Sequence, residues 1–204
     1  CLNSIQSFMS TKDASTASKY LARFAMLMRQ SLEYINLEYI SLEDEIEFLS
    51  NYLDLNCNLR FDGNLTTDIR LDDDLEEDII GVPTMILQPY VENAVEHGLR
   101  GRKHGHVQID FSPYGQEAIK AIITDDGVGR ERVRDMHALD PTRKQHRSRG
   151  TEITLRRLSL LQRSSSLPEE EKEPVTITDL YDEDGSPAGT RVEVVIPIRD
   201  LSLN

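Results

Sequence analysis

A short polar cluster interrupts an otherwise apolar stretch at residues 87–99, which reads LQPYVENAVEHGL. If this stretch is one helix, two carboxylates, an amide and an imidazole lie within two turns of one another: Glu92, Glu96, Asn93 and His97. Carboxylates and imidazoles can move protons, and an amide oxygen is a ligand that Mg²⁺ accepts. Taken alone, such a pattern is more often a solvated helix face, so the rest of the chain must decide.

A second cluster, IITDDGVG at residues 122–129, ends a buried-looking strand with two carboxylates and two glycines. The spacing fixes an acceptor, Asp125, at the strand edge, and Gly127 and Gly129 allow the backbone to approach a flat ligand closely. Because acidic glycine sequences are common in ordinary turns, this motif is a weak signal on its own.

Two later stretches of the sequence add further candidate site residues. RGTEITLRRL, residues 149–158, begins a helix at Gly150, where free N–H groups and the helix dipole favour phosphate. AGTRVEVVIP, residues 188–197, places the hydroxyl of Thr190 at the start of a strand. Four weak signals therefore occur in a fixed order.

In this order the stretches resemble the N, G1 and G2 boxes and the final strand of the GHKL, or Bergerat-fold, ATP-binding domain. More narrowly, SLEDEIEFLSNYLDLNCNLRF followed by VPTMILQPYVENAVEHGL resembles the LytS-like sensor histidine kinases. The resemblance spans nearly the whole chain. It implies a helical dimerisation and histidine-phosphotransfer segment followed by a catalytic ATP-binding domain.

The resemblance also implies roles for residues near the phosphates. Asn93 would ligate the Mg²⁺ ion that bridges the ATP phosphates, and His97 would approach those phosphates. Gly150 would offer its backbone N–H to a phosphate oxygen.

For the base, the resemblance implies that Asp125 accepts a hydrogen bond from the adenine amino group. Gly127 and Gly129 would shape the base pocket, and Thr190 would support the adenine contact.

The sequence departs from the family pattern in two places. Relatives that hydrolyse ATP carry a carboxylate one turn before the metal-binding Asn, where this chain has Pro89. We therefore expect poor hydrolysis, with Glu92 as a candidate for polarising water, although it points about 100° around the helix from Asn93. The G2 segment has one glycine, Gly150, where many relatives have two, which leaves the lid contacts open.

The elements that must position these groups begin with two amphipathic helices. The first has an apolar stripe with spacings of three and four, formed by Leu21, Ala25, Met28, Leu32 and Ile35. The second begins at Ser41, whose hydroxyl can cap the helix while Asp44 reciprocates. Its apolar face consists of Leu42, Ile46, Leu49, Leu53 and Cys57.

Two such helices form a hairpin that leaves apolar surface exposed. We expect a second copy of the chain to cover it in a four-helix bundle, with Leu21, Met28, Leu32, Leu49 and Leu53 at the interface. The alternative is packing against the rest of the same chain.

After RFDGN, residues 60–64, the spacing of apolar residues changes from three or four to two. This alternation predicts a half-buried strand at 65–71. This predicts a boundary near Asp62, with a truncated dimerisation and phosphotransfer segment at 1–61 and the GHKL domain at 62–204. Within the second part we expect helices at 84–99 and 150–163, and strands at 106–112, 117–124, 174–181 and 190–197. The fold class is α+β, a helical hairpin followed by an α/β sandwich.

Composition and charge limit the function classes. The chain of 204 residues lacks both a signal peptide and a membrane-length apolar run. Its net charge of -13 argues against a general nucleic-acid binder. Residues 130–163 nevertheless hold 10 basic against 4 acidic side chains, which suits a polyphosphate or a solvated loop.

The function implied is the cytoplasmic kinase core of a two-component sensor, whose full-length form would be an inner-membrane protein. It would transfer the γ-phosphoryl group of Mg-ATP to a His, and a response-regulator Asp would then receive it. The alternatives are another GHKL ATPase, such as a chaperone or mismatch-repair clamp or an anti-sigma serine kinase, or a catalytically silent dimerisation module.

The phosphoacceptor is expected outside this sequence. The Asn-Pro-His-Phe motif of the family falls just upstream of the position matching CLNSI, and all five histidines follow the helical segment: His97, His104, His106, His137 and His146. We therefore expect this chain to hold ATP without phosphorylating itself.

Overall fold

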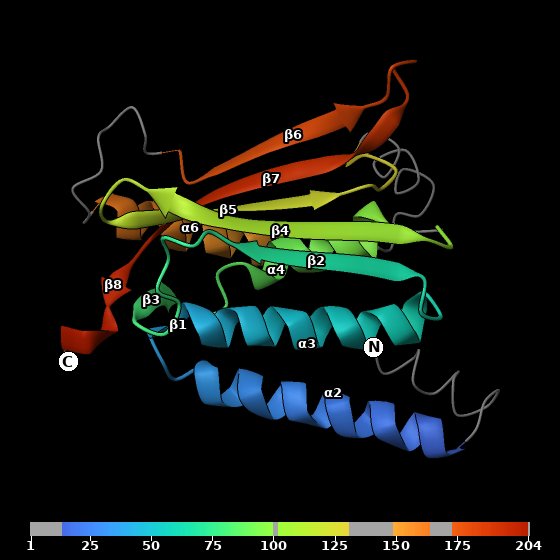
Figure 1. The fold of residues 1–204 in the computed structure, drawn as a ribbon, viewed down its shortest axis with the longest axis horizontal. Helices are drawn as coiled ribbons and strands as arrows, with labels where there is room; N and C mark the ends of the chain where they lie inside the picture. The colour runs from blue at the N-terminus through green and yellow to red at the C-terminus, as the bar shows by residue number, and fades with distance from the viewer. Residues whose placement is uncertain (1–13, 100–101, 131–148, 164–172, 204) are drawn as a thin grey trace.

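The computed structural model describes residues 14–99, 102–130, 149–163 and 173–203. Most of the first half of the basic stretch at 130–163 lies outside the described residues. The described part is a mixed α+β structure with a five-stranded and a three-stranded sheet (Figure 1). Within this part, no helix is long and apolar enough to cross a membrane.

The larger sheet has the strand order β2-β4-β5-β7-β6. These strands are β2 (Leu65–Leu71), β4 (Gly105–Tyr114), β5 (Ala118–Asp125), β6 (Val175–Tyr181) and β7 (Pro187–Pro197). β2 pairs with β4 in parallel, and every other pairing in this sheet is antiparallel. The predicted strands are confirmed, with ends that differ by three residues or fewer.

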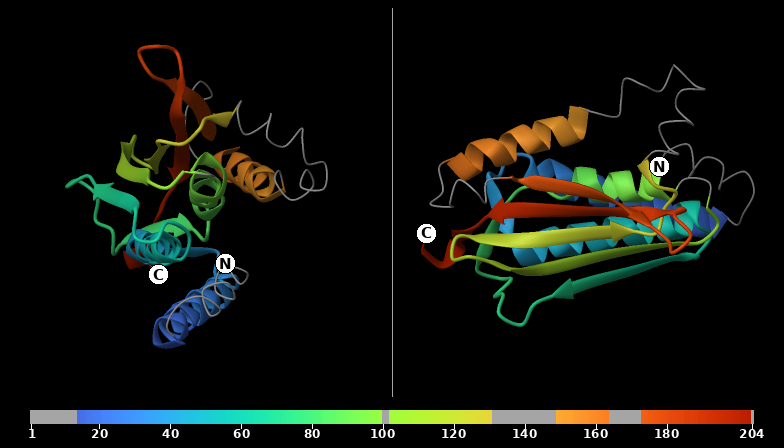
Figure 2. Two further views of the ribbon diagram at one scale, coloured as in Figure 1. Left: turned by 90° about the vertical axis from the view of Figure 1, so that its right-hand side faces the viewer. Right: turned by 90° about the horizontal axis from the view of Figure 1, so that it is seen from above.

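Three helices cover one face of this sheet: α3 (Leu42–Arg60), α4 (Gln88–Asn93) and α6 (Arg149–Arg163) (Figure 2). The alternation along β4 explains this layering, since Val107, Ile109 and Phe111 are buried while the intervening Gln108 and Asp110 are half-buried. The alternating side chains of a strand point to opposite faces, so one face joins the core and the other stays polar.

A second, smaller sheet was not predicted. It joins β1 (Tyr39–Ser41), β3 (Ile80–Pro83) and β8 (Arg199–Asp200) in the order β1-β3-β8, and the 3₁₀ helix η4 (Leu201–Leu203) follows. Strands of two to four residues are too short to show an alternating pattern, which is why periodicity misses them.

The N-terminus of α3 forms as the sequence predicts. The Ser41 hydroxyl accepts a hydrogen bond from the backbone N–H of Asp44 at 3.0 Å, and the helix begins at Leu42. The predicted role of its apolar face at a dimer interface is wrong, however, because Leu49 and Leu53 are fully buried in the core of their own chain. The alternative, packing on the same chain, is correct for α3.

Helix α2 (Ala14–Tyr34) lies along the outer side of α3, away from the sheet (Figure 1). The predicted stripe of α2 is exposed, including Leu21, Met28 and Leu32 at 47%, 47% and 62%. A neighbouring face packs instead, formed by Ala17, Tyr20, Phe24, Leu27 and Tyr34. The helix therefore has two apolar faces, and only one of them is covered.

A single core cluster extends from Leu27 of α2 to Ile196 of β7. It contains residues on both sides of Asp62, so α3 shares its core with the sheet. Asp62 and Gly63 have positive φ values of 53° and 85° at the turn that ends α3. The domain boundary near Asp62 stays a prediction.

Candidate functional site

The polar stretch noted first in the sequence folds as two successive helical segments. Helix α4 carries Pro89 in its first turn and ends at Asn93, and a short π-helix, η1 (Ala94–Gly98), continues it. The backbone N–H of Leu99 reaches the carbonyl of Ala94 at 3.0 Å, five residues back. Such single π-turns often occur at functional sites.

A cavity opens between α4, the end of β5 and the start of α6. It is lined by Tyr90, Asn93, Ala94, Gly98, Asp125, Gly129, Arg130, Thr151, Ile177, Thr190 and Val192. Four of the residues predicted from the sequence thus meet in one place: Asn93, Asp125, Gly129 and Thr190.

Asp125 is the buried carboxylate of this cavity, with only 4% of its surface exposed. It lies opposite Thr190 in the register of β5 and β7. Its Oδ1 accepts a hydrogen bond from the Gly127 N–H at 2.9 Å. Burial raises the pKa of Asp125 to about 7, and the Gly127 hydrogen bond offsets part of that increase.

Glycines surround this carboxylate because there is no room for a side chain. A Cβ on Gly98 would lie 2.6 Å from Asp125 Oδ1, and a Cβ on Gly127 would lie 2.2 Å from the Gly98 carbonyl oxygen. A Cβ on Gly189, which has a φ of 136°, would lie 1.9 Å from the Asp125 carbonyl oxygen. Gly127 therefore shapes the site from behind the cavity wall.

Gly98 and Gly189 are site residues that the sequence reasoning missed. Gly98 was visible as the glycine that ends the VENAVEHG stretch, but its contact joins two segments far apart in the chain. The Val128 N–H donates to the Gly98 carbonyl at 2.9 Å, which ties η1 to the glycine turn.

The second carboxylate of the DDGVG motif has a different task. Asp126 accepts the backbone N–H of His106 at 2.8 Å and pairs with Arg102 at 3.3 Å. It therefore fixes the start of β4 beside the glycine turn, and the cavity receives only Asp125.

The Tyr90 side chain is a further residue of the cavity wall. It is 3% exposed, its hydroxyl has no hydrogen-bond partner in the described part of the chain, and burial raises its pKa to about 12. A buried donor without a partner is costly, so the Tyr90 hydroxyl is an unsatisfied polar group beside the cavity.

The start of α6 lies beside α4. A Cβ on Gly150 would be 3.8 Å from the Pro89 Cβ, and the next residue, Thr151, lines the cavity. Gly150 itself is not among the lining residues. Because the first N–H groups of a helix have no partner within it, this end of the cavity suits an anion.

Glu92 lies apart from the residues that line the cavity, and only the backbone of His97 is described. The Glu92 carboxylate accepts a hydrogen bond from Gln88 Nε2 at 2.7 Å. Burial raises the pKa of Glu92, and the hydrogen bond from Gln88 offsets part of that increase. The backbone of His97 belongs to η1, one turn beyond Asn93.

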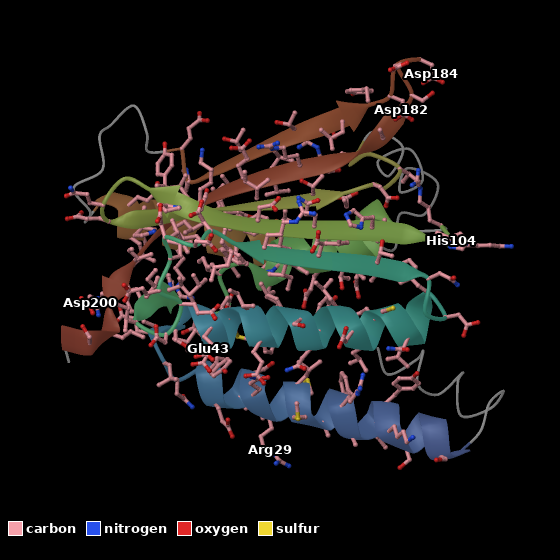
Figure 3. The ribbon with its side chains drawn as sticks, in the orientation of Figure 1. Arg29, Glu43, His104, Asp182, Asp184 and Asp200 are labelled. Atoms are coloured by element: carbon pink, nitrogen blue, oxygen red, sulfur yellow. The ribbon has the colours of Figure 1, made fainter. Side chains whose placement is uncertain are left out.

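The other two histidines of the described part, His104 and His106, do not line the cavity. His104 is exposed at the end of the molecule (Figure 3), and His106 Nδ1 lies 2.9 Å from Thr66 Oγ1. His137 and His146 fall outside the described residues.

The residues present fit Mg-ATP in chemical type. A buried carboxylate acceptor in a glycine-lined wall suits an amino group on a flat base, and the α6 N-terminus suits phosphate. No group of three or more His, Cys, Asp or Glu residues that could hold a metal occurs in the described ranges. Mg²⁺ commonly takes few protein ligands and completes its shell with phosphates and water, so the Asn93 amide is a sufficient type of ligand.

Comparison with known proteins shows that the chain is similar to histidine kinases. Residues 1–65 match the histidine kinase family. The sensor protein LytS of Oceanobacillus iheyensis is 31% identical over 120 residues, which cover 58% of this chain and 20% of that protein. The sensor histidine kinase/phosphatase LytS of Staphylococcus aureus is 29% identical over 150 residues, covering 72% of this chain and 25% of that protein.

The chain thus spans a fifth to a quarter of the length of these curated relatives. Among solved structures, its fold is similar to the histidine kinase domain of the blue-light activated histidine kinase EL346 from Erythrobacter litoralis. The TM-score is 0.52 at 17% identity, over 90% of this chain and 81% of that one. Together, these matches confirm the resemblance: the chain is related to the LytS-like sensor histidine kinases.

Proposed function

We propose that this chain is the ATP-binding core of a sensor histidine kinase and that the cavity around Asp125 binds Mg-ATP. The observation that carries the proposal is Asp125 itself, a buried carboxylate in a wall of glycines, with Asn93 and the start of α6 lining the same cavity. An exocyclic amino group on a flat base is a donor that matches this acceptor.

The residues would divide the ligand between them. Asp125 would accept the hydrogen bond of the adenine amino group, with Thr190 beside it on β7. Asn93 would ligate Mg²⁺, which neutralises phosphate charge when bound. The N–H groups at Gly150 and Thr151 would receive phosphate oxygens, and His97 would approach the phosphates from η1.

For phosphoryl transfer, these residues act mainly by position and charge. The nucleophile we propose is a His preceding this sequence, and a response-regulator Asp would be the next acceptor. The first 96 residues contain no histidine. We expect the 204-residue chain to leave radiolabelled γ-phosphate on the nucleotide, and an acid-labile label on any of its five histidines would contradict this.

The ATP would also be hydrolysed slowly. Pro89 stands where hydrolysing relatives have a carboxylate, and Glu92 is bonded to Gln88. Loss of a general base costs about 10²–10⁴-fold in rate.

A homodimer is the proposed assembly, through the exposed stripe of α2 rather than through α3. That stripe includes Leu21, Met28 and Leu32, which are 47–62% exposed on one side of α2, and Ile35 directly after the helix is 70% exposed. Contiguous apolar surface of this kind is typical of an interface.

The decisive experiment is titration calorimetry of Mg-ATP with three variants of the full chain. Asp125→Asn and Asn93→Ala should each weaken binding about tenfold or more, the cost of a lost charge-assisted contact. Asp182→Asn, at the exposed tip of the β6–β7 hairpin (Figure 3), is the matched control and should bind as wild type. Unchanged affinity in both site variants would refute the assignment.

A further inference from the structure

A second buried carboxylate, which the proposed function does not use, lies in the core. Glu45 is 1% exposed and sits on the apolar side of α3 between Leu42 and Leu49, both fully buried. Removing a carboxyl group from water is costly unless the protein supplies hydrogen-bond donors. The hydrogen-bond donors around the Glu45 carboxyl group therefore indicate its structural role.

The donors come from the turn before α4. Glu45 Oε1 accepts the backbone N–H of Leu87 at 3.2 Å, and the Met85 backbone lowers the pKa of the carboxyl group, whereas Oε2 has no hydrogen-bond partner among the described residues. Met85 has a φ of 55°, which is uncommon for a residue other than glycine. Successive N–H groups around a left-handed residue form a concave site for an anion, and the Glu45 carboxyl group occupies it.

This turn leads directly into the helix that carries Asn93. Leu87 is the N-cap residue of α4 and makes no side-chain cap of its own. Asn93 follows six residues later, which at the helical rise places it about 9 Å further along the helix axis. The position of the turn therefore sets the position of Asn93 at the cavity.

The same turn is held from the other side by α6. The Arg157 guanidinium donates to the carbonyl oxygens of Thr84 at 2.6 Å and Glu38 at 3.1 Å. The Thr84 hydroxyl donates to the carbonyl of Leu37 at 2.8 Å. Residues 84–87 thus join α3, α4, α6 and the connection that follows α2.

We propose that Glu45 is a positioning residue of the nucleotide pocket: from α3, its carboxyl group fixes the Met85–Leu87 turn and so sets where α4 presents Asn93. The identity of the ligand rests on the proposed function. The hydrogen bonding between Glu45 and the Met85–Leu87 turn does not rest on the proposed function, and it can be measured without nucleotide.

The first test follows the Leu87 amide resonance of the full chain by NMR as the pH is varied. Burial raises the pKa of Glu45 to about 7, and among the described residues Arg157 of α6 is the charged group that opposes the increase. An amide bonded to this carboxylate should titrate with that midpoint. Glu45→Gln keeps an acceptor oxygen but cannot ionise, so the titration should vanish.

The matched control is Glu47→Gln, an exposed glutamate on the same helix, which should leave the Leu87 titration unchanged. A Leu87 titration that is identical in wild type and Glu45→Gln would overturn the inference. The second test uses a Glu45→Leu variant. If that variant does not fold, the Leu87 titration alone tests whether Glu45 holds the turn.

The second test measures Mg-ATP affinity. Glu45→Leu should raise the dissociation constant about tenfold because the turn loses its acceptor, whereas Glu45→Gln should stay within about threefold of wild type. Wild-type affinity in a folded Glu45→Leu variant would refute the role in positioning. If the wild-type chain binds no nucleotide, the proposed function fails, and the Leu87 titration still decides whether Glu45 holds the turn.

Discussion

Arg130 and Asp179 form a two-point ion pair at the edge of the cavity, with the guanidinium Nε and Nη2 each 2.8 Å from a carboxylate oxygen. Arg130 directly follows Gly129, and Asp179 belongs to β6, two residues beyond the cavity-lining Ile177. The pair therefore fastens the glycine turn to the edge strand of the sheet and completes one wall.

We predict that Arg130→Lys weakens Mg-ATP binding about three- to tenfold. A lysine keeps the charge but cannot make two parallel hydrogen bonds with one carboxylate, so the wall loosens. Thermal stability should change little because the pair is partly exposed. Calorimetry measures the affinity. Arg191→Lys, which alters a similar partly exposed pair with Glu193, is the control; equal affinities in the two variants would contradict this role.

The affinity for ATP should depend on pH through Asp125. Its pKa is raised to about 7, and only the ionised form offers both oxygens to an amino donor. Binding should therefore be strongest above pH 7 and weaken as the pH falls, approaching about tenfold per pH unit well below the pKa. Because ATP also titrates, the measured quantity is the ratio of wild-type to Asp125→Asn affinity. A ratio that is constant from about pH 6 to about pH 8 would exclude this mechanism.

Glu45 should make stability fall as the pH rises. Its pKa is raised from 4.5 to about 7 by burial, so the folded state binds more protons than the unfolded state between these values. Its stabilising contribution is present below about pH 4.5 and is lost as the pH rises through 7. Glu45→Gln should therefore match wild type near pH 5 and exceed it at pH 8, by about 3 kcal/mol at most.

Urea denaturation of both proteins at the two pH values measures this difference. Asp125 contributes in the same direction to both proteins and cancels in the comparison. A difference between the proteins that does not grow with pH would show that Glu45 is not the titrating group.

The exposed stripe of α2 should govern self-association. Leu32→Glu places a charge in the stripe at a side chain that is 62% exposed, so it should shift the chain towards monomer with little change in unfolding temperature. The matched control is Met26→Glu, which adds the same charge at an apolar side chain that is 51% exposed. Met26 lies outside the stripe, about 120° around the helix from Leu32. Sedimentation or light scattering distinguishes the two variants, and a wild-type chain that is monomeric at every concentration would rule out this interface.

Much of the fold follows from local pattern. The strands β4, β5 and β7 and the helix α6 are long enough for their periodicity to identify them, and the Ser41 cap follows from residue type. The π-turn of η1 does not, because it depends on Gly98 fitting against Asp125 rather than on any preference of residues 94–98.

The face of a helix that packs is likewise a tertiary property. Helix α2 has two neighbouring apolar faces, and the sequence cannot tell which of them meets α3. Asn93 and Asp125 line the cavity and lie within motifs that the sequence singles out, whereas Ile177 was not predicted because β6 reaches the cavity only through sheet order. Glu45 was missed because a charged residue on α3 is normally solvated.

The parallel pairing of β2 with β4 also bears on how the chain folds. Thr66 meets His106 across 40 positions of sequence, and the intervening segment contains β3, α4 and η1. Closing so long a loop costs entropy before the strand contacts repay it, so such pairings form slowly. The helix bearing Asn93 lies inside that loop. The edge strand and the cavity around Asp125 should therefore be completed together, late in folding, and a chain caught before that step would have most of its antiparallel sheet but an incomplete cavity.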